Sequence, residues 1–164
     1  MVINKKIFLR AILLGAAAGI IAYLILTFIH NPWEESLAAL FIGPIIGIVE
    51  KKKSFVLIGL FSCVLGWFVG TYFVGVLFEI GLGAWAFAGA ALGLASGLAG
   101  SSFFRSLSGF ILGFFAGLVA EASRYLFVLG LGIKAIDMQL LVLLVAGILL
   151  PLAGVLVYKP AEKK

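Results

Sequence analysis

Long segments without charge constrain the fold of this chain most. Of its 164 residues, 64% are apolar and only 12% are charged. Soluble domains are roughly 25% charged. A small soluble domain has too little interior to bury this much apolar surface. The sequence therefore predicts an all-α integral membrane protein, in which lipid surrounds most of the side chains.

Six apolar segments come close to the about 20 residues that a helix needs to cross a bilayer. The second segment is short, but Asn31 and Pro32 favour a helix start before it, and Lys51 suits its C-terminal end. Pro44 is expected to kink this helix. Asp137 is expected to cap the last helix. We therefore expect one membrane domain, 1–164, with transmembrane helices at about 7–29, 32–52, 54–78, 83–99, 106–129 and 138–158.

The basic residues indicate the orientation, because lysine and arginine collect in cytoplasmic loops. With the N-terminus inside, ten of the twelve basic residues fall on the cytoplasmic side: Lys5, Lys6, Arg10, Lys51, Lys52, Lys53, Arg105, Lys159, Lys163 and Lys164. Both termini are therefore expected in the cytoplasm, in a multi-pass protein of the cell membrane. The basic residues lie at the ends of apolar segments rather than along one stripe, so membrane lipids and not nucleic acids are the expected partners.

Glycines recur at four-residue spacing, which places small residues on neighbouring turns of one helix face: Gly15/Gly19, Gly43/Gly47, Gly66/Gly70, Gly89/Gly93/Gly97 and Gly109/Gly113/Gly117. In lipid, such ridges let helix backbones approach closely. They either pack the helices of one chain together or dock a partner subunit or a second copy. The pattern Leu-Gly-x-x-x-Gly at 14–19, 65–70 and 112–117 also suggests three tandem two-helix repeats, unless it reflects chance similarity between apolar segments.

Glu121 and Arg124 are the two charges deepest within an apolar segment. Ionisable residues inside a membrane are costly and usually face the bundle interior or a wet cavity. Glu121 continues the ridge of Gly109, Gly113 and Gly117, so we expect it to point between helices. Together with Arg124 it forms either a binding site open to the outside or a self-neutralising pair that stabilises the end of the helix.

Aromatic side chains collect toward the outer side, at Tyr23, Tyr72, Trp85 and Tyr125. These side chains either line a pocket that opens outward or form the aromatic belt common at membrane interfaces. Trp67 lies near the middle of its segment and is expected in the core, where its indole N–H requires a partner.

Motifs typical of enzymes are absent from the sequence, including G-x-S-x-G, H-E-x-x-H and the Walker loop. Cys63 is the only cysteine and His30 the only histidine, so neither a metal cluster nor a disulfide is expected. The sequence predicts no catalytic activity, cofactor or metal.

The leading functional prediction is a transport-type protein that binds or passes a small solute from the outer side. Its ligand-binding residues would be Glu121, Arg124, Tyr125, Tyr72, Tyr23 and Trp85. In size, helix count and orientation the chain resembles the substrate-capturing subunits of energy-coupling-factor vitamin transporters. Small residues on the first helix of that family dock the coupling partner, which implies the same role for Ala11, Gly15 and Gly19. The alternative is a structural or assembly subunit of a larger membrane complex, and a channel would need a wet path that these helices do not suggest.

Overall fold

The computed structural model describes residues 5–28, 34–75, 83–99, 103–130 and 135–158. This part of the chain is all-α, as expected, and contains no strand. Its elements are α1 (Lys5–Phe28), α2 (Glu34–Ile42), α3 (Ile45–Val49), α4 (Lys53–Phe68), the π-helix η1 (Val69–Gly75), α6 (Ala84–Ala99), α7 (Phe103–Gly130) and α8 (Ala135–Val157).

Four helical stretches within the described residues are long and apolar enough to cross a membrane: Lys5–Phe28, Lys53–Phe73, Phe103–Tyr125 and Met138–Val157. Two further apolar stretches, Ser36–Val49 and Ala84–Ala99, are shorter. At 1.5 Å per residue they reach about 21 Å and about 24 Å. Both values fall below the roughly 30 Å of a hydrocarbon core. The expectation of six crossings therefore stays a prediction.

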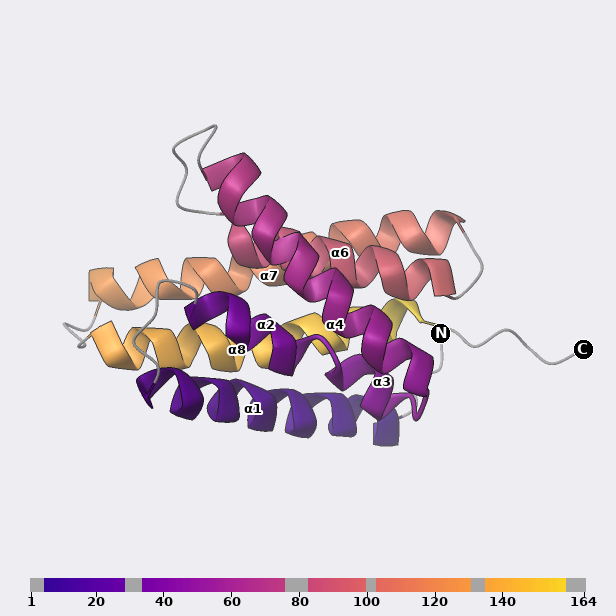
Figure 1. Ribbon diagram of the computed structural model, residues 1–164, viewed down its shortest axis with the longest axis horizontal. Coiled ribbons are helices and arrows are strands. Elements are labelled where there is room, and N and C mark those ends of the chain that lie inside the picture. Colours follow the sequence, from indigo (N-terminus) through magenta and orange to yellow (C-terminus); the bar gives the residue numbers. More distant parts are fainter. Residues whose placement is uncertain (1–4, 29–33, 76–82, 100–102, 131–134, 159–164) are drawn as a thin grey trace, which may run out of the picture.

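Most helices lie alongside one another. Figure 1 shows α1, α6, α7 and α8 side by side, with α4 crossing them obliquely. The most extensive packing joins α6 to α7, followed by α1 to α8 and α7 to α8, and α6 also packs against α4. The first residues of α1, α4 and α7 and the last residues of α8 lie at the same end of the bundle (Figure 1).

Close approach between helices depends on glycine. An added Cβ at Gly113 of α7 would overlap the backbone carbonyl of Gly89 in α6, and an added Cβ at Gly89 would overlap that of Gly113. The same reciprocal relationship joins Gly93 to Gly109. Because neither residue of a pair carries a side chain, the two backbones touch directly. These glycine ridges therefore face other helices of the same chain.

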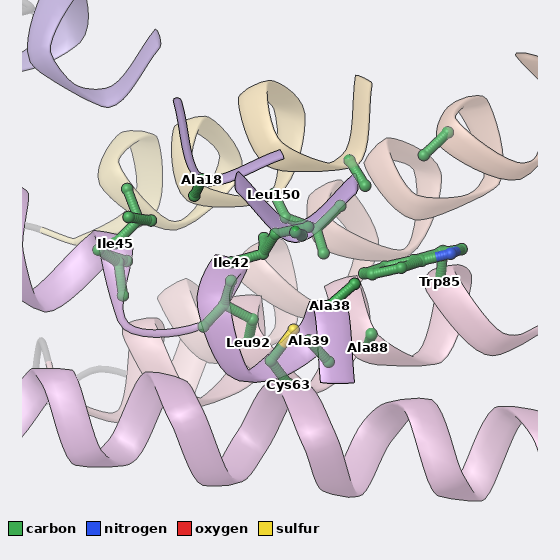
Figure 2. Close-up of a cluster of buried hydrophobic side chains, with 14 of the residues drawn as sticks. Ala18, Ala38, Ala39, Ile42, Ile45, Cys63, Trp85, Ala88, Leu92 and Leu150 are labelled. Atoms are coloured by element: carbon green, nitrogen blue, oxygen red, sulfur yellow. The ribbon is translucent and has the colours of Figure 1, made fainter. Parts of the chain in front are cut away.

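The core consists mainly of alanine and medium-sized aliphatic side chains. Figure 2 shows a cluster to which α2, α4, α6 and α8 all contribute, with Cys63 and the fully buried Trp85 among its members. The outer surface is also apolar, since large side chains are exposed along α1, α4 and α7, including Leu13 (59%), Phe61 (67%) and Phe115 (59%). An apolar surface on several faces is typical of a bundle surrounded by lipid.

The helix expected at 32–52 is divided in the structure. Asn31 and Pro32 lie outside the described residues, and α2 begins at Glu34 and ends at Ile42. Pro44 occupies the N-cap position of α3 with a helical backbone conformation. Because proline lacks an N–H and its ring clashes with the preceding turn, the two parts do not join into one continuous helix.

The end of α3 also differs from the expectation. The residue after its C-cap, Lys51, has a positive φ of 56°. The N–H groups of Lys51 and Lys52 donate to the carbonyls of Ile48 (3.2 Å) and Gly47 (2.9 Å), respectively. This is the hydrogen-bond pattern of a Schellman motif, which terminates a helix with one left-handed residue. The expected helical extension to position 52 was therefore wrong.

The third expected helix, 54–78, also changes character before its end. It is α-helical to Phe68 and π-helical from Val69 to Gly75, and its last three residues lie outside the described range. Asp137 lies within the first turn of α8 instead of preceding the helix as a cap. The bounds of α1, α6, α7 and α8 agree with the expected ones to within three residues.

Candidate functional site

Glu121 in α7 is buried, and its carboxylate meets the beginning of α6. Its Oε1 atom accepts hydrogen bonds from the backbone N–H of Gly83 (3.0 Å) and of Trp85 (3.1 Å). The first N–H groups of a helix have no acceptor within that helix. The positive end of the helix dipole also favours a carboxylate at this position. Glu121 therefore caps α6 from a neighbouring helix.

The glycine ridge of α7 brings Glu121 to this position. Gly117 lies one turn before Glu121, and an added Cβ there would overlap the backbone carbonyl of Trp85. The two helices are thus in backbone contact immediately below the carboxylate. As the spacing predicts, the Glu121 side chain lies between helices, with only 6% of the residue exposed.

The π-helix η1 approaches the same end of α6. An added Cβ at Gly70 would overlap the backbone carbonyl of Gly83, the residue whose N–H binds Glu121. Thr71 follows Gly70 directly, and Trp67 precedes it by about one turn. π-Helical turns are rare and occur frequently at functional sites. The α7 carboxylate, the first turn of α6 and η1 therefore converge at Gly83.

Three buried donors in this region have no hydrogen-bond partner among the described residues. They are the indole N–H groups of Trp67 and Trp85 and the hydroxyl group of Thr71. Trp85 is completely buried and Trp67 is 5% exposed. A buried donor without an acceptor costs about 1–3 kcal/mol, so three of them in one region require an explanation. We refer to Trp67, Thr71, Trp85 and Glu121 as the buried polar cluster.

The other residues expected to bind a ligand lie farther toward the surface. Tyr72 and Tyr125 are 45% and 47% exposed, and the ring of Tyr72 stacks on Phe68 with 5.9 Å between centroids. Tyr23 packs partly buried against the hydrophobic core. Arg124 is partly buried on the turn of α7 that follows Glu121. Of the six expected residues, the structure joins Trp85 and Glu121 directly.

Sequence reasoning missed one member of the cluster, Thr71, and the backbone N–H of Gly83 that binds Glu121. Neither belongs to a sequence motif, because both are brought to the site by the packing of η1 against α6. Trp67 was expected in the core, where its indole N–H would need a partner. It is buried in the structure, and this N–H has no hydrogen-bond partner among the described residues. The only signal in the sequence that could have indicated Thr71 is its position four residues after a tryptophan in an apolar segment.

The residues expected to dock a partner face the interior of the chain. Ala11 is completely buried, and added Cβ atoms at Gly15 and Gly19 would overlap the backbone carbonyls of Gly147 and Leu143 in α8. A partner helix would reach this face of α1 only after α8 had moved. The docking role therefore stays a prediction.

A second polar contact lies at the end of the bundle where α4 begins. The ammonium group of Lys52 donates to the hydroxyl of Tyr158 and lies 5.0 Å from the centre of its ring. The same ring packs against Phe55, with centroids 4.7 Å apart. Burial raises the pKa of the nearby Glu50 above its ordinary value of 4.5, and the charge of Lys52 offsets part of that shift. These contacts attach the turn between α3 and α4 to the end of α8.

The described residues contain no group of three or more His, Cys, Asp or Glu side chains able to hold a metal ion. Comparison with protein-family models, with curated proteins and with solved structures finds no significant match.

Proposed function

We propose that this protein is a multi-pass protein of the cell membrane that binds a small solute from the outer side, as part of transport. The observation that carries the proposal is the group of three buried donors beside Glu121. A binding site in a membrane protein typically combines a mostly apolar lining with a few convergent polar groups. The buried polar cluster has this composition.

The proposed topology has six crossings and cytoplasmic termini. It is supported by the position of the described basic residues, which belong to the helix ends that lie together in Figure 1: Lys5, Lys6, Arg10, Lys51, Lys52, Lys53 and Arg105. A concentration of lysine and arginine at one end of a bundle is typical of its cytoplasmic side. α6, although short, packs against α4, α7 and α8. A central helix surrounded in this way needs less length than one exposed to lipid on all sides.

The position of Glu121 supports access from the outer side. At 1.5 Å per residue it lies about 27 Å from the beginning of α7 and about 14 Å from its end. The beginning of α7 is the end that carries Arg105, which the topology places in the cytoplasm. The cluster therefore lies in the outer half of the proposed bundle.

The experiment that tests solute binding is native mass spectrometry of the protein purified in a gentle detergent. Wild type should retain a small molecule, and Thr71→Val should retain less because it removes one donor at nearly constant shape. Trp85→Phe should also retain less, because it removes the indole N–H together with part of the buried ring system. Ser108→Ala on the exposed face of α7 serves as the matched control. Equal retention in all four proteins would contradict the assignment of the site.

The assembly-subunit alternative receives less support from the structure. Its expected docking ridge on α1, which includes Gly15 and Gly19, is covered by α8. A partner would have to use an exposed apolar face, such as the one of α1 that carries Leu13. Copurification of a protein with wild type, and its loss in Leu13→Asn but not in Thr71→Val, would favour this alternative.

A further inference from the structure

We infer that the ligand of the buried polar cluster is an uncharged small molecule whose oxygen atoms accept hydrogen bonds, such as an amide, a lactone or a polyol. This inference rests on the proposed solute-binding function and specifies its ligand class.

The cluster offers mainly donors. An indole N–H can only donate, and Trp67 and Trp85 each place one such group in the buried region. The Thr71 hydroxyl can donate as well, and it has no partner among the described residues. A complementary ligand must therefore supply acceptors, and carbonyl or hydroxyl oxygens are the usual ones. An ammonium-type ligand brings further donors and would leave the two indole groups unsatisfied.

The charge of the region argues against an anion. Glu121 and Arg124 lie on successive turns of α7, and their formal charges cancel. The Glu121 Oε1 atom is already engaged by two backbone N–H groups at the positive end of α6. An anionic ligand would place a second negative charge beside this carboxylate in a low-dielectric interior, where repulsion is strong. An uncharged ligand avoids that cost.

The spacing of the donors limits the size of the ligand. Trp67 and Thr71 are four residues apart, at the junction where α4 passes into η1, so they lie about one helical turn from each other. Across the contact between Gly70 and Gly83, Trp85 belongs to the first turn of α6. A polyol carries hydroxyl oxygens a few bonds apart and can accept from more than one donor, whereas an amide or a lactone accepts through one carbonyl group.

The indole N–H resonances of ¹⁵N-tryptophan-labelled protein test the inference directly. Trp33 is the only other tryptophan, so Trp33→Phe leaves the two indole signals of the cluster. The probes are N-methylacetamide and δ-valerolactone as uncharged acceptors, with sodium acetate and methylammonium chloride as matched ions. The uncharged probes should move at least one of the two signals in a saturable way, whereas the two ions should not.

Variants of Thr71 separate ligand recognition from a general effect on the fold. Thr71→Val should weaken binding of N-methylacetamide by about fivefold, the effect of one neutral hydrogen bond. Thr71→Ser keeps the hydroxyl group and should bind like wild type. Equal weakening in both variants would show that the hydroxyl does not contact the ligand, and would overturn its role.

Two other outcomes would overturn the inference, and they differ in what they mean for the proposed function. Saturable shifts with acetate or methylammonium, or copurification of an ion, would show that the site binds a solute but that the ligand is charged. That result would contradict the inferred ligand class and leave the proposed function in place. Indole protons that exchange rapidly with D₂O and respond to none of the four probes would show that water satisfies the donors. That result would remove the ligand class and the proposed solute site together.

Discussion

The carboxylate of Glu121 and the backbone N–H of Trp85 are 3.1 Å apart and form a hydrogen bond between α7 and the first turn of α6. A second bond from the N–H of Gly83 reaches the same oxygen. This contact explains why an ionisable side chain is placed deep in an apolar helix. Its acceptor satisfies backbone groups that would otherwise be buried without a partner.

Replacing Glu121 should therefore affect stability through the cap. Glu121→Ala leaves two buried N–H groups without an acceptor and should lower the free energy of unfolding by about 2–4 kcal/mol. Glu121→Gln keeps an amide oxygen in the same place and should cost about 1 kcal/mol. Thermal unfolding in detergent, followed by tryptophan fluorescence, measures both values. Equal stability of the alanine and glutamine variants would show that the carboxylate does not act as a cap.

The contact between Gly89 and Gly113 leads to a prediction about packing. A methyl group at position 113 would overlap the carbonyl oxygen of Gly89, so Gly113→Ala should force α6 and α7 apart. We expect a loss of about 1–3 kcal/mol, the usual effect of overpacking. Ser108→Ala introduces the same side chain on the exposed face of α7 and should change stability little. The denaturant midpoint of each purified variant measures the difference.

The left-handed conformation of Lys51 predicts a stabilising substitution. A side chain at a φ of 56° is unfavourable, and glycine adopts this conformation readily. Lys51→Gly should therefore raise the free energy of unfolding by about 0.5–1 kcal/mol. Lys53 is the first residue of α4, so Lys53→Gly should instead lower it. A stability of Lys51→Gly below that of wild type would contradict the assigned helix end.

Burial of Glu50 predicts a pH dependence of stability. Because burial raises its pKa in the folded state, this group contributes stability while it is protonated. That contribution is present below the ordinary value of 4.5 and is lost as the pH rises through the higher pKa of the folded state. Glu50→Gln cannot lose a proton and should show a flatter profile. Unfolding temperatures of both proteins between pH 4 and pH 7, measured in the same detergent, provide the comparison.

The proposed topology predicts which side of the membrane each turn occupies. In a Cys63→Ala background, a cysteine at position 53 should react with a membrane-impermeant maleimide only after the cells are permeabilised. A cysteine at position 79 should react in intact cells, because the charge distribution places it outside. Labelling of position 53 from outside intact cells would reverse the orientation and the proposed direction of access.

The lengths and limits of the apolar segments determined most of the helix positions. Segments such as 83–99 and 106–129 are long, apolar and free of internal proline, and the only charges within them are Glu121 and Arg124. Local preference and tertiary packing therefore agree on a helix. The sequence did not indicate that the helix expected at 32–52 would break at Pro44 and end before Lys51. The loss of one N–H at Pro44 predicts a kink or a break equally well, and the outcome depends on what packs around it.

The sequence by itself determined that this protein is helical, that lipid suits its surface and that Glu121 points between helices. These properties follow from composition and from the angular spacing of residues on one helix, which do not depend on neighbouring elements. The tertiary structure decided what Glu121 meets there, which helices the glycine ridges contact and that η1 is π-helical. Those features depend on pairs of residues far apart in the chain, such as Gly70 with Gly83, and their contacts form only when the helices pack.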